Sequence, residues 1–541
     1  MVFNLPPLDY PYLAHLFIIS ITYFITWGYI IFSKTSFLID DQDGLERFND
    51  RWDGEKVINT YEHDENGIKT SYNNISYNPR VGLPGSVIRW LRLNLGKKFT
   101  VIGKNSKGHE VFGYVQSPRR HHAISFIVHF ANVILTYFFL ARIFDPTLAF
   151  LSTLLFVVHP VTCQAVAWIS GIGYLQCLFF ALVSFHIALS NPNPYLLMPG
   201  VFFSSLLSAW GLFSGAFNFI PLLLIGKFEA GIIASLILFV AFFQFGKGFV
   251  TRRVSEFKKQ NMARSTFLNP RKPIVMIKTL WYYLRLVIFP KRLGLFHSWG
   301  YHYDEKLERI DGLFWKGLLS LVILISLAIL GPYAVTFGIV WFITYLLVFS
   351  NFMTAMQFVV DRYVFISSLG FCIVASYYLQ DYPVIFSFVL GIFLMRTLVH
   401  LPTFKNLVSF YKSNIENFPD SEVAYGNLGV TLHHEGKTGS AMDHWTESAK
   451  INPYYDVPHY NMYQVYRMSG MLQQAKDELN KCLNSKTVHF PEMWSKEMEG
   501  LEKTMAIQSR KNEINNEINK YFAEGNFEKM SELKKEMENL K

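Results

Sequence analysis

The stretch RRHHAISFIVHFANVILTYFFLARIFDPTLAFLSTLLFVVHPVTCQAVAWISG, residues 119–171, decides the fold of this chain. After its basic start it holds two long apolar runs, interrupted only by a short segment that carries Arg142 and Asp145. A helix needs roughly 20 apolar residues to cross the hydrocarbon core of a bilayer. We therefore predict two membrane-spanning helices here, at about 122–142 and 147–168.

Similar apolar runs recur on both sides of this stretch, up to about residue 400. Of the 541 residues, 51% are hydrophobic and only 17% are charged, whereas about a quarter are charged in soluble proteins. We predict an all-α fold, a polytopic membrane bundle over 1–402 followed by a helical tail over 403–541. The predicted spans are about 12–32, 122–142, 147–168, 172–190, 195–212, 216–226, 229–246, 313–331, 333–350, 363–380 and 383–400, eleven in all.

The ends of the chain and its long loops follow from this count. No Lys or Arg precedes the first apolar run, so we expect a retained span rather than a cleaved signal peptide. An odd number of spans puts the termini on opposite sides of the membrane. With a cytoplasmic N-terminus, the loops 33–120 and 247–311 and the tail face away from the cytoplasm, in a bacterial inner membrane or the endoplasmic reticulum.

Composition also excludes several classes of protein. The four cysteines form no CxxC pair, which argues against a disulfide framework or a zinc site. The formal net charge of +9 is most concentrated in a loop between spans, so phosphate on a lipid or sugar carrier is a better partner than nucleic acid. No P-loop, dinucleotide fingerprint, HExxH or nucleophile elbow occurs, so a nucleotide-driven pump or soluble-type hydrolase has no support.

The tail shows an internal repeat. Small, large and Pro residues fall at the spacing of a 34-residue helix-turn-helix unit of tetratricopeptide type. These are Tyr425, Leu428, Gly429, Leu432, Gly436, Ala441, Trp445 and Pro453. A shift of 34 residues places Gly470 over Gly436 and Ala475 over Ala441, and Gly525 begins a partial third unit. Such stacks present a groove to a protein partner or pack on their own membrane domain.

Three acidic residues follow the first span closely: Asp40, Asp41 and Asp43. Carboxylates at a membrane surface can bind a divalent cation that holds a phosphate, or one of them can take a proton from an attacking hydroxyl. The same cluster is also compatible with a solvated turn.

Histidines and arginines gather where the second span begins. Arg119 and Arg120 precede it, and His122 and His129 share one face of the predicted helix because they are seven residues apart. Guanidinium groups grip phosphate in a bidentate way, but a basic flank that anchors the helix end is an equal alternative. His159-Pro160 predicts a kink, with His159 making an orienting hydrogen bond or contacting substrate.

A basic segment lies between the spans, at 247–292. Twelve Lys and Arg residues face a single acid there, interleaved with aromatic and aliphatic side chains as in TLWYYLRLVIFPKR, 279–292. This pattern suits a helix in the membrane interface that binds an anionic lipid-linked substrate, or nonspecific attraction to anionic headgroups. VIRWLRLNL, 87–95, is a second candidate interfacial helix or a packed helix of a loop domain. Asp361 and Arg362 open a span and suggest a local ion pair.

Several of these segments together resemble one known family, the transmembrane and tetratricopeptide-repeat-containing proteins of the GT-C glycosyltransferase superfamily, and their bacterial relatives. The matching pieces are FLIDD (37–41), RRHHAISFIVHFANVILTYFF (119–139), LLFVVHPVTCQAVAWISG (154–171), WYYLRLVIFPKRLGLFHSWG (281–300), WFITYLLVF (341–349) and DRYVFISSLGF (361–371). The resemblance implies a GT-C-like membrane fold and an enzyme that moves a sugar from a polyprenyl-phosphate carrier to a protein or glycan acceptor on the extracytoplasmic face.

The resemblance also implies roles for individual residues. Asp40 and Asp41 match the family's catalytic acids, and with Asp43 they are candidate ligands of Mg or Mn. Arg119 matches the arginine before the second span, with Arg120 as the alternative. The candidate substrate-binding residues are Arg119, Arg120, His122, His159, Arg285, Lys291, Arg292 and His297.

Two positions depart from the family pattern. Ile172 takes the place of an arginine, and Ser214-Gly215-Ala216 takes the place of a Ser-Lys-Glu element. A second hypothesis therefore stays open beside the enzyme, namely a catalytically inactive membrane scaffold on the same fold whose repeat domain binds or assembles protein partners.

Overall fold

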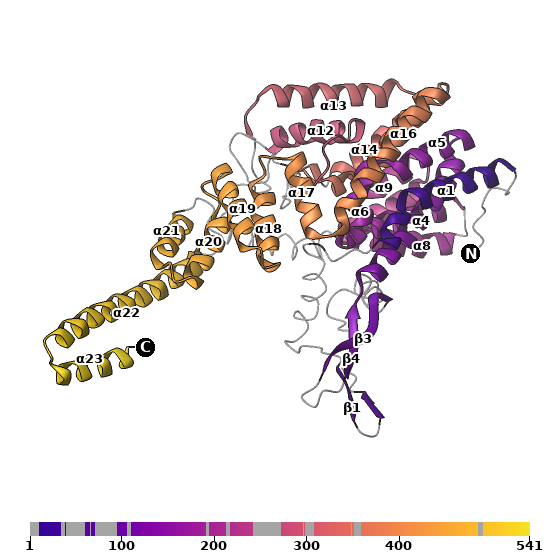
Figure 1. Ribbon diagram of the computed structural model, residues 1–541. Coiled ribbons are helices and arrows are strands. Elements are labelled where there is room, and N and C mark those ends of the chain that lie inside the picture. Colours follow the sequence, from indigo (N-terminus) through magenta and orange to yellow (C-terminus); the bar gives the residue numbers. More distant parts are fainter. Residues whose placement is uncertain are drawn as a thin grey trace. The chain divides into compact units, whose positions relative to one another are not determined.

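The computed structural model describes residues 10–33, 38, 60–64, 67–70, 95–104, 110–190, 194–212, 217–241, 272–295, 297, 308–347, 349–350, 359–484 and 491–540 (Figure 1). The chain divides into two compact units. The first comprises Met1–Arg252 and Ser265–Pro419, and the second comprises Arg253–Arg264 and Asp420–Lys541. Each unit is described by itself below.

Helices form where the spans of the first unit were predicted. Those of the first half are α1 (Tyr10–Phe32), α4 (Pro118–Ile143), α5 (Pro146–Val158), α6 (Cys163–Ala167), α7 (Ile172–Leu189), α8 (Pro194–Leu212), α9 (Phe219–Leu224) and α10 (Phe228–Ala241). Those of the second half are α12 (Lys272–Ile288), α13 (Gly312–Leu330), α14 (Tyr333–Leu347), α15 (Phe365–Leu379), α16 (Pro383–His400) and α17 (Leu407–Asn417). Short 3-10 turns also occur at η1 (Pro160–Thr162), η2 (Ile169–Gly171), η7 (Asp361–Val364) and η8 (Leu401–Lys405).

Six helices in the described part of the chain are long and apolar enough to cross a membrane, or seven if the bent pair Pro146–Val158 and Pro160–Ala167 is one span. The six are Pro11–Phe32, Pro118–Ile143, Ile169–Leu189, Gly312–Leu330, Asp361–Leu379 and Pro383–Lys405. Two further apolar helices, Pro199–Ser208 and Tyr333–Leu347, are shorter than the roughly 20 residues that a crossing needs. The chain is therefore an integral membrane protein with several spans, and the number eleven stays a prediction.

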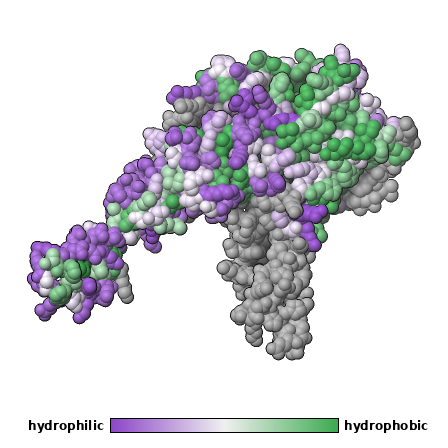
Figure 2. Space-filling view, viewed as in Figure 1, coloured by the Kyte–Doolittle hydropathy of each residue, from purple (hydrophilic) through white to green (hydrophobic). Residues whose placement is uncertain are grey.

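Aromatic side chains fill the inside of the bundle. Phe139 of α4 stacks on Phe185 of α7 with ring centroids 5.2 Å apart, and both rings contact Trp341 of α14. By contrast, the outward face of α13 leaves large apolar side chains exposed, such as Leu319 and Ile329. Figure 2 shows hydrophobic residues gathered over the bundle helices and hydrophilic ones over the tail helices. This distribution suits a bundle surrounded by lipid.

The first long loop contains a β-sheet, which the all-α prediction missed. Four strands pair antiparallel in the order β2-β1-β4-β3. They are β1 (Thr60–Asp64), β2 (Gly67–Thr70), β3 (Lys97–Lys104) and β4 (Glu110–Gln116), with a register shift between Val101 and Gly103. Short runs such as TVI and VFGYV are rich in residues that favour strands, but a span-seeking hydropathy reading overlooks runs of this length. Of the helix predicted at 87–95, only Leu95 is described, and it lies in a helical turn with Gly96.

The amphipathic helix predicted within 279–292 is part of α12, which packs along α13. A buried lysine links the two, because Lys278 Nζ lies 2.7 Å from Asp311 Oδ2. Asp311 also accepts hydrogen bonds from the backbone N–H groups of Leu313 and Phe314, which caps the start of α13. Partial burial raises the pKa of the Asp311 carboxyl, but the bonds from Lys278 and the two N–H groups outweigh burial and hold this pKa below its ordinary value.

The second unit is built from three consecutive helix pairs. They are α18 (Glu422–His434) with α19 (Thr438–Ile451), α20 (Asp456–Met468) with α21 (Leu472–Leu483), and α22 (Pro491–Ala523) with α23 (Phe527–Asn539). A glycine with positive φ makes each turn, namely Gly436 (79°), Gly470 (73°) and Gly525 (72°). Only glycine adopts this conformation without a steric cost, so the sequence placed all three turns correctly.

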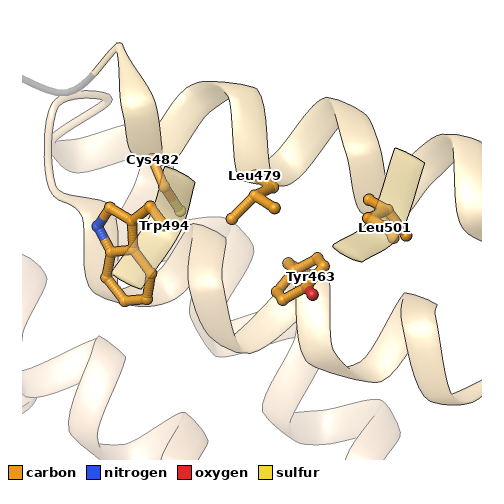
Figure 3. Packing of buried hydrophobic residues seen from close by; sticks show 6 residues of the cluster. Tyr463, Leu479, Cys482, Trp494 and Leu501 are labelled. Carbon is orange, nitrogen blue, oxygen red and sulfur yellow. The ribbon is translucent and has the colours of Figure 1, made fainter. Parts of the chain in front are cut away.

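Packing between these pairs is apolar and close. Tyr463, Leu479, Cys482, Trp494 and Leu501 are buried in one cluster formed by α20, α21 and α22 (Figure 3). The third pair departs from the 34-residue spacing because α22 is 33 residues long.

The boundary between the units lies later than the predicted residue 402, after Pro419. The reason is α17, which packs on the segment after α12. Asn414 Oδ1 accepts a hydrogen bond from Leu295 N at 2.8 Å, and Asn417 Nδ2 donates to the Leu293 carbonyl at 3.1 Å. The helix that follows the last span is thus part of the membrane unit.

Candidate functional site

Three helix ends meet at one end of the bundle. Near the end of α1, Trp27 Nε1 donates to the Val157 carbonyl at 3.1 Å. The ring of Trp27 lies 5.4 Å from that of His129 on α4, which in turn lies 6.0 Å from Phe156 on α5. The end of α1, the first half of α4 and the end of α5 are therefore close together. The predicted catalytic and metal-binding acids lie outside the described residues: Asp40, Asp41 and Asp43.

The predicted kink at His159 is confirmed, because the helices on either side are bent by 54°. His159 is completely buried, and both of its ring nitrogens are used inside the protein. Nδ1 accepts from Val161 N at 3.3 Å, so Nε2 carries the proton and donates to the Val287 carbonyl at 3.0 Å. This arrangement agrees with an orienting role, and it ties the break in the helix to the end of α12.

The last span, α16, also contacts the break at His159 and the segment after α12. Thr397 Oγ1 of α16 donates to the Val158 carbonyl at 2.6 Å. Arg396 donates from Nε to the Pro290 carbonyl at 3.2 Å and from Nη2 to the Lys291 carbonyl at 2.6 Å. The backbone after α12 is therefore anchored.

The predicted cationic side chains of this segment, in contrast, point outward. Arg285, Lys291 and Arg292 are exposed, and the guanidinium of Arg285 lies 5.3 Å from the centre of the Tyr282 ring. An anchored backbone with exposed cations is suited to binding an anionic group at the bundle end.

A buried acid–histidine pair lies beside the anchored segment. His297 Nε2 is 2.8 Å from Asp361 Oδ1, and Asp361 Oδ2 accepts the backbone N–H of Gly294 at 2.7 Å. A carboxylate only accepts hydrogen bonds, so Nε2 of His297 carries a proton and donates to Asp361, and in the neutral imidazole Nδ1 then carries the lone pair. The ring of His297 also contacts that of Phe418, with centroids 4.4 Å apart. Within the described residues, Nδ1 has no hydrogen-bond partner.

This pairing differs from the local ion pair suggested for Asp361 and Arg362. The two neighbours diverge from the short turn η7, so Arg362 lies over the Trp168 ring, 4.8 Å from its centre. The backbone N–H of Arg362 donates to Gln164 Oε1 at 2.9 Å, which joins η7 to α6. The partner of Asp361 is instead 64 residues away in sequence.

The predicted residues at the start of α4 are placed differently from one another. Arg119 and Arg120 are exposed in its first turn, whereas His122 is buried, with 2% of its surface exposed. The helices α4 and α5 pack against each other, and His129 of α4 contacts Phe156 of α5. Of the predicted substrate-binding residues, the contacts link His159 to the end of α12 and His297 to Asp361, whereas Arg119, Arg120, His122, Arg285, Lys291 and Arg292 remain candidates.

Sequence reasoning missed Asn414 and Asn417, which hold the segment before His297 from α17. Asn is ordinary in a helix facing water, so no local signal marks these two. Among the described residues, no group of three or more His, Cys, Asp or Glu side chains is arranged to hold a metal ion.

Comparison with known proteins gives one informative similarity. The chain is 25% identical over 385 residues to a protein O-mannosyl-transferase of Caenorhabditis elegans, an alignment that covers 65% of this chain and 53% of that protein. The chain thus spans about half the length of the relative it matches. No family profile matches the chain, and no solved structure matches it.

Proposed function

We propose that this chain is a membrane glycosyltransferase-like protein. In this proposal it takes a sugar from a polyprenyl-phosphate carrier and transfers it to a hydroxyl of a protein or glycan acceptor on the extracytoplasmic face. The observation that carries the proposal is the similarity to a protein O-mannosyl-transferase. Exposed cations in the segment that His159 and Asp361 contact, namely Arg285, Lys291 and Arg292, support it.

The candidate site residues have separate roles in the proposed reaction. Asp40 or Asp41 takes the proton of the acceptor hydroxyl, or these two with Asp43 would hold a Mg or Mn ion that neutralises charge on the carrier phosphate. Carboxylate oxygens are the ligands that such hard cations prefer, so the residues fit the ion chemically. His297, with its tautomer set by Asp361, accepts a hydrogen bond from a hydroxyl of the substrate.

The carrier phosphate is held by exposed cations rather than by the arginine of the family pattern. Ile172 takes that position and is 3% exposed, so no charge faces a ligand there. The other departing element, Gly215-Ala216, lies outside the described residues. Arg119, Lys291 and Arg292 remain available to neutralise the phosphate.

The tail is proposed to be a tetratricopeptide-type repeat domain on the extracytoplasmic side that presents the protein acceptor. The successive helix pairs and the 34-residue distance between Gly436 and Gly470 support this part of the proposal. Stacked helix pairs commonly offer an extended surface to a peptide.

The decisive experiment is a transfer assay with the full-length protein in lipid vesicles that contain polyprenyl-phosphate mannose, in which mannose is the sugar in the similar protein's name and the carrier is the one proposed here. Wild type should transfer mannose, and Asp41→Asn should abolish transfer while the protein still folds. The matched control is Asp381→Asn, which changes an exposed acid between α15 and α16. Unchanged transfer by Asp41→Asn would remove the assigned acid. If wild type transfers sugar from none of the polyprenyl-phosphate sugars tested, the enzyme hypothesis is rejected in favour of the scaffold hypothesis.

A further inference from the structure

A stripe of polar side chains runs along the buried face of α4. It consists of His122, Ser125, His129, Asn132 and Thr136, each with 2% or less of its surface exposed. The steps of three and four residues keep all five within about 80° of the helix circumference, and they extend over about 21 Å of its axis. We call these five residues the α4 polar stripe. Polar groups at this depth in a spanning helix are costly and normally functional.

Most polar atoms of the α4 polar stripe lack a protein partner. Both ring nitrogens of His122 and of His129, the hydroxyls of Ser125 and Thr136, and Oδ1 of Asn132 are fully buried without a hydrogen bond. Only Asn132 Nδ2 is satisfied, by the Leu175 carbonyl of α7 at 2.8 Å. A buried polar atom left without a partner costs about 1–3 kcal/mol, so this many along one helix face require a partner from outside the chain.

Buried hydroxyls elsewhere in the bundle form hydrogen bonds within their own helix, whereas those of Ser125 and Thr136 do not. The common solution is a bond to a backbone carbonyl three or four residues earlier in the same helix. It is used by Thr26, Thr153, Ser184 and Ser204, at distances of 2.6–2.7 Å. This solution is open to Ser125 and Thr136 as well, yet their hydroxyls do not take it.

The neighbours of His129 supply no donor or acceptor. Four aromatic rings surround it with centroids within 6.0 Å: Tyr23, Trp27, Phe156 and Phe365. The Tyr23 hydroxyl already donates to the Phe126 carbonyl at 2.7 Å, and Trp27 Nε1 donates to the Val157 carbonyl. Nothing in these walls can satisfy two imidazole nitrogens, and their apolar faces disfavour a large polar ligand.

We propose that the α4 polar stripe binds a file of water molecules inside the bundle. Water is small, it both donates and accepts, and it needs two to four polar partners, which the stripe offers along its whole length. The hydroxyl of Ser152 on α5, the helix packed against α4, is also buried without a partner and can join the file. The water file gives His122 and His129 contact with protons from bulk solvent. This inference does not depend on the proposed transferase activity.

Deuterium exchange at the C2 carbon of histidine, read by mass spectrometry, tests the proposal on the full-length protein in detergent micelles. The chain supplies a matched control in His159, which is equally buried but has both ring nitrogens bonded within the protein. His122 and His129 should exchange several-fold faster than His159. Exchange at all three as slow as at His159 would overturn the water file.

A second measurement keeps the test independent of exchange chemistry. Ser125→Ala and Thr136→Val each remove one hydroxyl from the α4 polar stripe with little change of volume. In a dry interior both variants should melt at a higher temperature than wild type, because each loses an unpaired polar atom. With water bound to the stripe, neither variant should melt higher. A raised Tm in both variants would therefore refute the proposal.

Discussion

The pair formed by Asp361 and His297 leads to a prediction in which two substitutions at one position behave differently. Asp361→Ala removes the acceptor of two hydrogen bonds, from Gly294 N at 2.7 Å and from His297 Nε2 at 2.8 Å. Asp361→Asn keeps the shape. Its carbonyl oxygen can accept from Gly294, and its NH₂ can donate to Nε2 if His297 shifts its proton to Nδ1.

The expected magnitudes follow from these bonds. A hydrogen bond to a charged group contributes about 1.5–3 kcal/mol, so Asp361→Ala should destabilise the membrane unit by about 3–5 kcal/mol. Asp361→Asn makes two neutral bonds of roughly half the strength and should cost about 1–2 kcal/mol. The Asp361→Asn protein keeps its fold but holds His297 in the other tautomer, in which Nδ1 donates a hydrogen bond instead of accepting one.

Two assays separate these effects. Denaturant unfolding of the protein in mixed micelles should give the order wild type, Asp361→Asn, Asp361→Ala, with the larger gap before the alanine variant. Mannose transfer by the folded Asp361→Asn protein should fall by roughly 10- to 100-fold in kcat/KM, since one substrate hydrogen bond of about 1.5–3 kcal/mol is replaced by two opposed donors.

The two results fail in different ways. If Asp361→Asn unfolds as readily as Asp361→Ala, the exchange of tautomers does not occur and the reasoning about the buried pair is refuted. If Asp361→Asn is stable and fully active, the pair is structural and His297 contacts no substrate.

Two further substitutions test the packing and the tail. Burial raises the pKa of the Glu478 carboxyl, but hydrogen bonds from His459 and Lys481 outweigh burial and hold this pKa below 4.5 in the folded tail. The ionised Glu478 therefore stabilises the folded tail above pH 4.5, and this stabilisation is lost as the pH falls below that value. Amide hydrogen exchange in α20 and α21 should therefore be faster in Glu478→Gln than in wild type at pH 6, with the difference vanishing in acid; an equal difference at every pH contradicts the linkage. A Cβ at Gly370 would overlap the Gly338 carbonyl oxygen of α14, so Gly370→Ala should destabilise the fold by about 1–3 kcal/mol and lower the Tm. Gly391 has open space around it, so the control Gly391→Ala should leave the Tm unchanged. An equal Tm for both variants would contradict the close approach of α14 and α15.

The membrane character of the chain could be predicted from sequence because hydropathy is a local property. Each apolar run is read without knowing its neighbours, and every predicted span has a helix at its position. The kink at His159 was equally local, since proline acts on its own helix. The sheet in the first long loop was missed because strand pairing joins segments such as 60–64 and 110–116 that are distant in sequence.

The candidate site was predictable only in part. Chemistry-bearing residue types, such as the arginines at the start of α4 and the cations after α12, can be recognised in the sequence. Their surroundings cannot, because burial and pairing depend on which helices meet. His122 is recognised as a histidine at a helix start, but only the structure shows it buried in a row of polar groups without partners.

By itself, the sequence determined that the chain enters the membrane repeatedly, where its helices lie, and where the glycine turns of the tail occur. These features depend on local composition and on backbone sterics. Only the tertiary structure decided that Asp361 pairs with His297 rather than with Arg362, and that α17 belongs to the membrane unit. The physical reason is the same in both cases, since a buried polar group binds the partner that packing brings within reach, however far away that partner is in the chain.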